Sequence, residues 1–351
     1  MLSFFTAIAA LAVSIPLASA NTWGKPLRFR ADGTFKIVEV SDVHHTGNLF
    51  CKDISAAQQK YPCSDANGTA FFQQAILDED PDVFVFTGDN VCSGDIFGGK
   101  NALDGLLADF VKASNTVPWL AVEGCVLPLR PPWRWLVSAA AGDANEERRH
   151  RPPFLARSNH DGESGLNYKQ VADYLLTLPN GLNEPNPMQV NGSGVPIFGN
   201  TNFWLGVYGP AGTNDENASL FNLYNVDSNS YSTDPKIPGY AWVHTDQIAW
   251  FSAVSANLTA AAAAQGRPQA PALAYQHIPL PQHQTIITDK LPIVGQYHET
   301  VCCPEIDTGL HAAFKAAGDV KALTVGHDHT NDYCGSFEGS VSADLPSPNL
   351  S

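Results

Sequence analysis

Short, continuous apolar runs alternate along this chain with longer amphipathic stretches. The run at 83–87 (VFVFT) is apolar at almost every position, which is typical of a strand buried on both faces. Similar runs predict strands at 35–40, 118–122, 203–208, 220–224, 272–276 and 322–325. Apolar residues at helical spacing predict helices at 69–79, 102–113 and 245–264. Strands that alternate with helices indicate parallel crossover units, and therefore an α/β fold.

The composition fits a globular protein and narrows its partners. The 351 residues are 44% hydrophobic and 16% charged, which argues against disorder. The formal net charge of −15 excludes a broad basic surface, so we expect no nucleic acid as a structural partner. An acidic protein can still bind a phosphate group where metal ions supply positive charge.

The first 20 residues have the pattern of a secretory signal peptide. An uncharged apolar stretch ends in Ala18-Ser19-Ala20, which resembles an A-x-A cleavage site. The alternative is an uncleaved anchor, but the stretch is short for a bilayer and contains Pro16. We expect a leader at 1–20, one domain at 21–351 with no membrane span, and a secreted or vacuolar/lysosomal location.

The cysteines and the glycosylation sequons agree with export. The chain has seven cysteines and no C-x-x-C pair, so disulfides are a better interpretation than a zinc knuckle or a thioredoxin-like site. We therefore predict a disulfide-bonded glycoprotein. The sequons begin at Asn67, Asn191, Asn217, Asn257 and Asn349.

Five short polar motifs each follow an apolar run, where open α/β sheets assemble their sites. Their carboxylate, amide and imidazole groups suit zinc, manganese or iron. Each motif alone could occur by chance, but their order and their position after strands favour a metal site. Seven ligands exceed the needs of one ion, so we predict two divalent metal ions, with one shared carboxylate. The candidate metal ligands are Asp42, His44, Asp89, Asn159, His277, His327 and His329.

The motifs D-x-H, G-D, N-H-D, a single His and G-H-x-H resemble the signature of the calcineurin-like metallophosphoesterase superfamily. The segments FKIVEVSDVHHTG and VGHDHTNDYCG look most similar to its secreted or vacuolar branch, which includes Dcr2-type and purple acid phosphatase-like phosphatases. The resemblance runs from about 35 to 339, apart from one segment described below. It implies a four-layer α/β/β/α sandwich that hydrolyses phosphate esters with a dinuclear metal centre.

The resemblance also implies a role for each residue. Asp42, His44, Asp89 and His329 would bind the first metal, whereas Asn159, His277, His327 and the bridging Asp89 would bind the second. His160 would act catalytically as a proton donor or charge stabiliser beside the leaving-group oxygen, and Asp161 would orient it. Cys92 occupies the position of the tyrosine in true purple acid phosphatases, so no ferric-tyrosinate colour is expected. The remaining histidines are predicted bystanders: His45, His244, His283, His298 and His311.

Three activities remain open at this point. The favoured one is hydrolysis of phosphate monoesters by a hydroxide that bridges the two metals. The first alternative is a phosphodiesterase, either sphingomyelinase-like or directed at nucleotides. The second alternative is an inactive secreted pseudo-phosphatase.

Two segments depart from the family pattern. A Pro- and Arg-rich stretch at 125–158 separates Gly124 from Asn159, although joining these two residues would restore the third motif. The stretch is either a lid or partner-binding arm, or an accretion such as a translated intron. After Gly339 the Pro/Ser-rich tail offers no obvious strand, so we expect a fold that is incomplete at the C-terminus.

Overall fold

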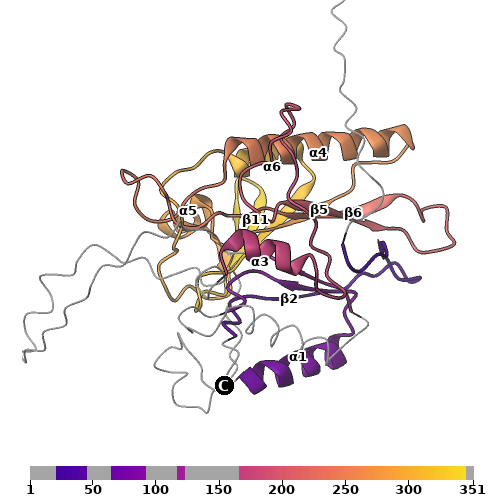
Figure 1. The fold of residues 1–351 in the computed structure, drawn as a ribbon, viewed down its shortest axis with the longest axis horizontal. Coiled ribbons are helices and arrows are strands. Elements are labelled where there is room, and N and C mark those ends of the chain that lie inside the picture. Colours follow the sequence, from indigo (N-terminus) through magenta and orange to yellow (C-terminus); the bar gives the residue numbers. More distant parts are fainter. Residues whose placement is uncertain (1–20, 46–64, 92–116, 123–165, 345–351) are drawn as a thin grey trace, which may run out of the picture.

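The computed structural model describes residues 21–45, 65–91, 117–122 and 166–344. These residues form two β-sheets with helices on their outer faces (Figure 1). Several predictions lie outside the described residues: the leader at 1–20, the helix at 102–113, the insert at 125–158, and Asn159, His160 and Asp161.

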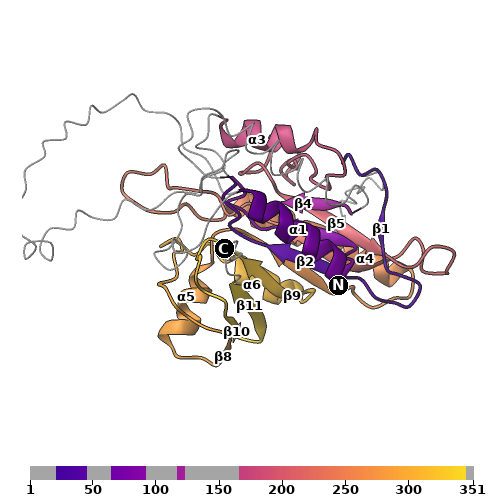
Figure 2. The same cartoon turned by 90° about the horizontal axis from the view of Figure 1, so that it is seen from below.

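The smaller sheet consists of β2 (Ile37–Val40), β3 (Val83–Phe86) and β4 (Trp119–Ala121), all parallel. Its alternating side chains pack in opposite directions. Phe84 and Phe86 pack among residues of α1 (Asp65–Glu79) and α3 (Tyr168–Leu175), while Val83 and Val85 face the larger sheet. In the view from below, α1 lies over β2 (Figure 2). The three strands predicted from apolar runs are confirmed, and α1 begins before the predicted residue 69.

The larger sheet has eight strands in the order β1-β5-β6-β7-β9-β11-β10-β8. The pairs β6–β7, β7–β9 and β9–β11 are parallel. On either side of them, β5 pairs antiparallel with β6, and β10 pairs antiparallel with β11. The strands are β1 (Leu27–Arg28), β5 (Phe203–Tyr208), β6 (Ser219–Asn225), β7 (Ala272–Tyr275), β8 (Ile293–Val294), β9 (Val320–Val325), β10 (Cys334–Phe337) and β11 (Ser340–Asp344).

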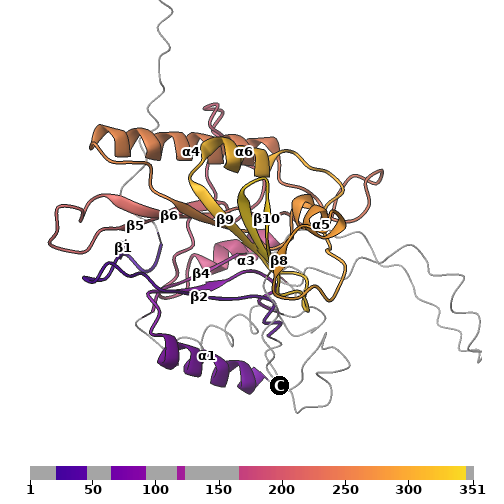
Figure 3. The ribbon, with the colours of Figure 1, turned by 180° about the vertical axis from the view of Figure 1, so that it is seen from behind.

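Two helices cover the outer face of the larger sheet. Trp250 and Phe251 of α4 (Thr245–Ala264) and Phe314 of α6 (Leu310–Ala317) pack with the apolar side chains of β6, β7 and β9. These helices lie on the side opposite α1 (Figure 3). A separate core fills the space between the sheets. The layers are therefore helix, sheet, sheet and helix, which confirms the predicted sandwich. No helix of the described ranges is long and apolar enough to cross a bilayer.

The segment after Gly339 corrects one prediction. Ser340–Asp344 forms β11, which lies between β9 and β10 and pairs with both. Its sequence, SVSAD, has only a weak β signal, so the expectation of no strand was wrong. Pairing with a neighbour on each side outweighs local propensity at such a position.

Candidate metal centre

Six predicted ligands meet where four parallel strands end. Asp42 and His44 follow β2, Asp89 follows β3, His277 follows β7, and the G-H-x-H motif follows β9. Backbone pairing continues past the strands and aligns the loops within each sheet. For example, Asp42 N donates to Gly88 O at 3.1 Å, and His44 N donates to Asp89 O at 2.9 Å. The candidate centre lies between the carboxyl ends of two separate sheets.

Two hydrogen bonds join the sheets at this point. His277 Nδ1 lies 2.8 Å from Thr87 O, and because a carbonyl oxygen only accepts, this nitrogen carries the proton. His277 Nε2 is thereby left as the nitrogen that could bind a metal. In the other direction, His327 N donates to Asp42 Oδ2 at 2.8 Å. Each sheet therefore orients a ligand of the other.

The loops turn sharply, and two glycines make the close approach possible. A Cβ at Gly88 would overlap the His277 ring, and a Cβ at Gly326 would overlap Ser41 Oγ. Several ligands also have left-handed backbone conformations, which cost roughly 1–3 kcal/mol each for residues other than glycine. These ligands are Asp42 (φ 52°), His44 (φ 50°), Asp89 (φ 43°) and His327 (φ 79°).

The first group of ligands converges on one point. His44 Nε2 and His329 Nε2 are 3.1 Å apart, and Asp42 Oδ1 lies 3.8 and 3.5 Å from them. Asp89 Oδ2 is 3.8 Å from His44 Nε2. Such spacings match donors around an ion with bonds of about 2.0–2.2 Å. The side chains of His44 and the two aspartates are almost fully buried.

The second group shares Asp89 with the first. Asp89 Oδ1 lies 3.3 Å from His277 Nε2, while Oδ2 of the same carboxylate is directed at His44. Asp89, His277 and His327 each offer a ligand atom within 4.8 Å of the others. One carboxylate thus presents an oxygen to each group, as a bridging ligand of two metals requires.

The charges of the site interact strongly. Burial by itself raises the pKa values of Asp42 and Asp89, but the neighbouring imidazoles outweigh it and lower both. Burial lowers the pKa of His277 and His329, yet Asp89 and Asp42 reverse this and raise them to about 10 and about 9. Burial and the nearby His277 lower the pKa of His327 to about 3, which keeps its ring neutral.

The residues fit a dinuclear metal centre. His277 Nε2 and both ring nitrogens of His327 are buried and accept no hydrogen bond within the described part of the chain. Buried polar atoms ordinarily have partners, so these nitrogens indicate a bound group. Imidazole nitrogen and carboxylate oxygen suit zinc, manganese or iron. Asn159 lies outside the described residues, so its place in the second group is not tested.

The predicted bystander histidines lie outside both groups of ligands. His45 Nδ1 pairs with Asp65 at 3.6 Å, His244 stacks on Phe198 with ring centroids 3.6 Å apart, and burial lowers the pKa of His283 to about 4. The disulfide prediction is not confirmed among the described residues, where Cys302 and Cys334 are free thiols. Four further cysteines lie outside the described residues.

Sequence analysis missed three residues near His327. The Tyr240 ring lies edge-on to the His327 ring, with centroids 4.7 Å apart. Cys302 and Asp328 form a third group of candidate ligands with His327. Asp328 occupies the variable position of the G-H-x-H motif, so the motif itself could have identified it as a candidate. No local sequence pattern marks Tyr240 or Cys302.

Comparison with known proteins agrees with this geometry. A family model described as calcineurin-like phosphoesterase matches residues 35–331. The chain is 34% identical over 345 residues to probable inactive purple acid phosphatase 29 of Arabidopsis thaliana, covering 97% of this chain and 77% of that protein. It is 32% identical over 343 residues to probable inactive purple acid phosphatase 14 of the same plant, with coverage of 94% and 74%. Phosphatase DCR2 of Saccharomyces cerevisiae is 29% identical over 328 residues, which are 90% of this chain and 47% of that protein.

Proposed function

Because this chain belongs to the calcineurin-like phosphoesterase family, we propose that it hydrolyses phosphate monoesters at a dinuclear metal centre. Asp42, His44 and His329 would hold the first metal, His277 and His327 the second, and Asp89 both. When bound, the two ions supply a water of lowered pKa as nucleophile and positive charge for the phosphate oxygens.

One observation carries the proposal. The two oxygens of Asp89 are directed at imidazoles from different sheets, with Oδ1 3.3 Å from His277 Nε2 and Oδ2 3.8 Å from His44 Nε2. The left-handed backbone of Asp89 and its almost complete burial hold that orientation. A preorganised carboxylate of this kind would hold two cations close enough to bind one phosphate group together.

We extend the proposal to the third motif, where Asn159 would complete the second site. His160 would donate a proton to the leaving-group oxygen, and Asp161 would orient the imidazole. His160→Ala should reduce turnover roughly 10²–10⁴-fold and leave the metal content unchanged. The deficit should shrink for esters of acidic alcohols, because such leaving groups need no proton. An equal deficit for all leaving groups would limit His160 to positioning.

The insert at 125–158 is proposed to be dispensable for this chemistry. Deleting it and joining Gly124 to Asn159 should raise second-site metal affinity and turnover, because a strand would then lead directly into the motif. Weaker metal binding or slower turnover in a folded deletion variant would make the insert a working lid or arm.

A substrate comparison tests the function itself. We expect p-nitrophenyl phosphate to be hydrolysed faster than its bis ester, with activity lost on chelation and restored by manganese, zinc or iron. A preference for the bis ester would favour a phosphodiesterase. The names of the two plant relatives favour a second candidate, an inactive phosphate-binding protein. Metal binding without turnover of either ester would support that candidate.

We also propose that the protein is exported through the secretory pathway. Two sequons, at Asn191 and Asn217, lie on exposed residues outside regular elements, which supports glycosylation there. The sequons at Asn67 and Asn257 lie within α1 and α4. Treatment of secreted protein with an endoglycosidase, followed by mass spectrometry, would identify the modified sites. An unchanged mass would contradict the proposal.

A further inference from the structure

His327 has one ring nitrogen more than the dinuclear centre uses. Both nitrogens are buried without a hydrogen-bond partner among the described residues, and the residue is 9% exposed. One nitrogen belongs with Asp89 and His277. The other nitrogen of a metal-binding histidine ordinarily contacts a carboxylate, a carbonyl or water. A thiol and a carboxylate also lie near the His327 ring, because ligand atoms of Cys302, Asp328 and His327 lie within 4.8 Å of one another.

The loop that carries Cys302 is held firmly against the G-H-x-H loop. Cys302 N donates to Asp328 Oδ1 at 3.1 Å. The fully buried Asn331 accepts from His298 N and Glu299 N through Oδ1, at 2.9 and 3.0 Å, and donates to Glu299 O at 3.0 Å. These bonds preorganise the thiol beside His327.

The surroundings of the thiol carry negative charge. The Asp328 carboxylate accepts from Cys302 N at 3.1 Å, and a ligand atom of Asp328 lies within 4.8 Å of the Cys302 sulfur. Cys302 is an exposed residue, so a cation can approach it from solvent. A thiolate, an imidazole nitrogen and a carboxylate oxygen are ligands typical of zinc and of its softer analogue cadmium.

We propose that Cys302, Asp328 and His327 form an auxiliary site for a thiophilic divalent cation. Binding releases the Cys302 proton to solvent and forms a bond between the sulfur and the cation. Because His327 belongs to both groups of candidate ligands, a cation in the auxiliary site and a cation in the second metal site compete for, or repel each other across, the same imidazole. Loading of the auxiliary site therefore weakens the second metal site, and linkage makes this antagonism reciprocal. The inhibitory consequence rests on the proposed function, but the binding does not.

Cadmium absorption tests the site directly. Full-length protein loaded with manganese is titrated with Cd²⁺ while the near-ultraviolet sulfur-to-cadmium charge-transfer band is recorded. Cys303→Ser, which replaces the adjacent thiol, is the control. It should show the same increase in the absorbance of this band as wild-type protein. Cys302→Ser should lack the part of the increase that corresponds to one sulfur per chain. An unchanged band in Cys302→Ser, or an equal loss in Cys303→Ser, would overturn the proposal.

A second variant covers the case in which Cys302→Ser fails to fold. Asp328→Asn keeps an oxygen that can accept from Cys302 N but removes the charge. It should retain the band at saturation and weaken cadmium binding by about 10–100-fold, as the loss of one ligand group does. Unaltered affinity would exclude Asp328 and contradict the site as proposed.

Inhibition provides a separate measurement. Cadmium should inhibit hydrolysis of p-nitrophenyl phosphate by wild-type protein, and Cys302→Ser should need on the order of tenfold more cadmium. Equal inhibition of both would contradict the antagonism. If no variant turns over substrate, the proposed function fails, and the absorption experiment still decides whether the auxiliary site exists.

Discussion

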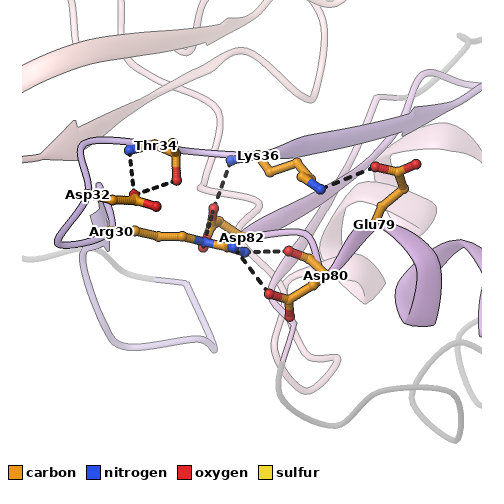
Figure 4. A network of polar contacts seen from close by, with 7 residues as sticks. All are labelled: Arg30, Asp32, Thr34, Lys36, Glu79, Asp80 and Asp82. Carbon is orange, nitrogen blue, oxygen red and sulfur yellow. Dashed lines mark hydrogen bonds and ion pairs between the residues drawn. The ribbon is translucent and has the colours of Figure 1, made fainter.

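The two ends of β2 and β3 hold charged side chains under opposite conditions. Near the amino end, Arg30 Nε donates to both oxygens of Asp82, at 2.9 and 3.0 Å (Figure 4). Asp82 Oδ2 also accepts from Lys36 N at 2.7 Å, and Lys36 Nζ pairs with Glu79 at 3.3 Å. Asp80 contributes a further contact to Arg30 at 3.1 Å while remaining 86% exposed. Each charge of this network has both a partner and solvent.

At the carboxyl end, the carboxylates have almost no exposure. The side chains of Asp42 and Asp89 are 0% and 1% exposed, and the charged or chargeable side chains beside them are imidazoles. Two of those imidazoles have raised pKa values because the carboxylates attract positive charge. The charged groups at the amino end have partners within the chain, and these contacts contribute to stability. The carboxyl end is built so that bound cations complete it, at a cost in backbone strain.

The largest expected effect separates the two ends by function. Asp89→Ala should disturb both metal sites and lower turnover roughly 10³-fold or more, since the ions contribute several kcal/mol. Asp82→Ala, at the other end of the same sheet, should leave metal content and turnover unchanged. Elemental analysis and a phosphatase assay check both variants. Full dinuclear occupancy in Asp89→Ala would remove the bridging assignment.

A smaller effect is expected from a ligand of one site only. His44→Ala should release chiefly the first metal, because His44 Nε2 points at Asp42 and at Asp89 Oδ2. The second site keeps Asp89 Oδ1, His277 and His327. Isothermal titration of chelated protein should therefore show one weakened binding event and one preserved event. Equal weakening of both would mean that the two groups act as one.

Glu39, within β2 between the two ends, is a buried carboxyl group that should make stability depend on pH. Burial raises the pKa of Glu39 from an ordinary 4.5 to about 8. After metal removal, the folded chain then keeps a proton that the unfolded chain releases above pH 4.5. The contribution of Glu39 to the free energy of unfolding should consequently fall by a few kcal/mol as pH rises from about 4.5 to 8, and remain constant below that window.

Glu39→Gln should remove this contribution, so that the variant loses less stability than wild-type protein across the window and is the more stable of the two at pH 8. Urea unfolding of chelated protein at several pH values measures the difference, and Glu79→Gln, 55% exposed at its side chain, is the control. A wild-type stability that does not change across the window would contradict the assigned burial of this carboxyl group.

The smallest effect is expected at the amino end. Asp82→Ala should lower the melting temperature by about 2–4 °C, because Lys36 N loses an acceptor and Arg30 Nε loses both carboxylate oxygens to which it donates. Arg30→Met should lower the melting temperature by less. Because the Arg30–Asp82 ion pair is partly exposed, 1 M salt should reduce the difference in melting temperature between wild-type protein and Arg30→Met. A large loss of activity in either variant would mean that the two ends are coupled.

Much of the fold was predictable from local patterns. The apolar run VFVFT and the turn at Gly88-Asp89 predict β3 and its ligand, because a strand buried on both faces needs apolar residues at every position. The helix predicted at 245–264 coincides with α4. The six described ligands were predicted from motifs, and the structure brings all of them together. Short elements such as β8 and α5 (Pro281–Thr288) are too brief for a period to be recognised.

The sequence by itself determined the ligand types, their order and the strands that precede them, since these depend on nearby residues. Tertiary structure alone decided which oxygen of Asp89 faces which imidazole, because those imidazoles come from different sheets. It also decided that Ser340–Asp344 is a strand, through pairing with β9 and β10. The same applies to Cys302, whose place beside His327 depends on partly buried hydrogen bonds between loops about 30 residues apart. Contacts between distant segments leave no period in the sequence, so folding in three dimensions is needed to specify them.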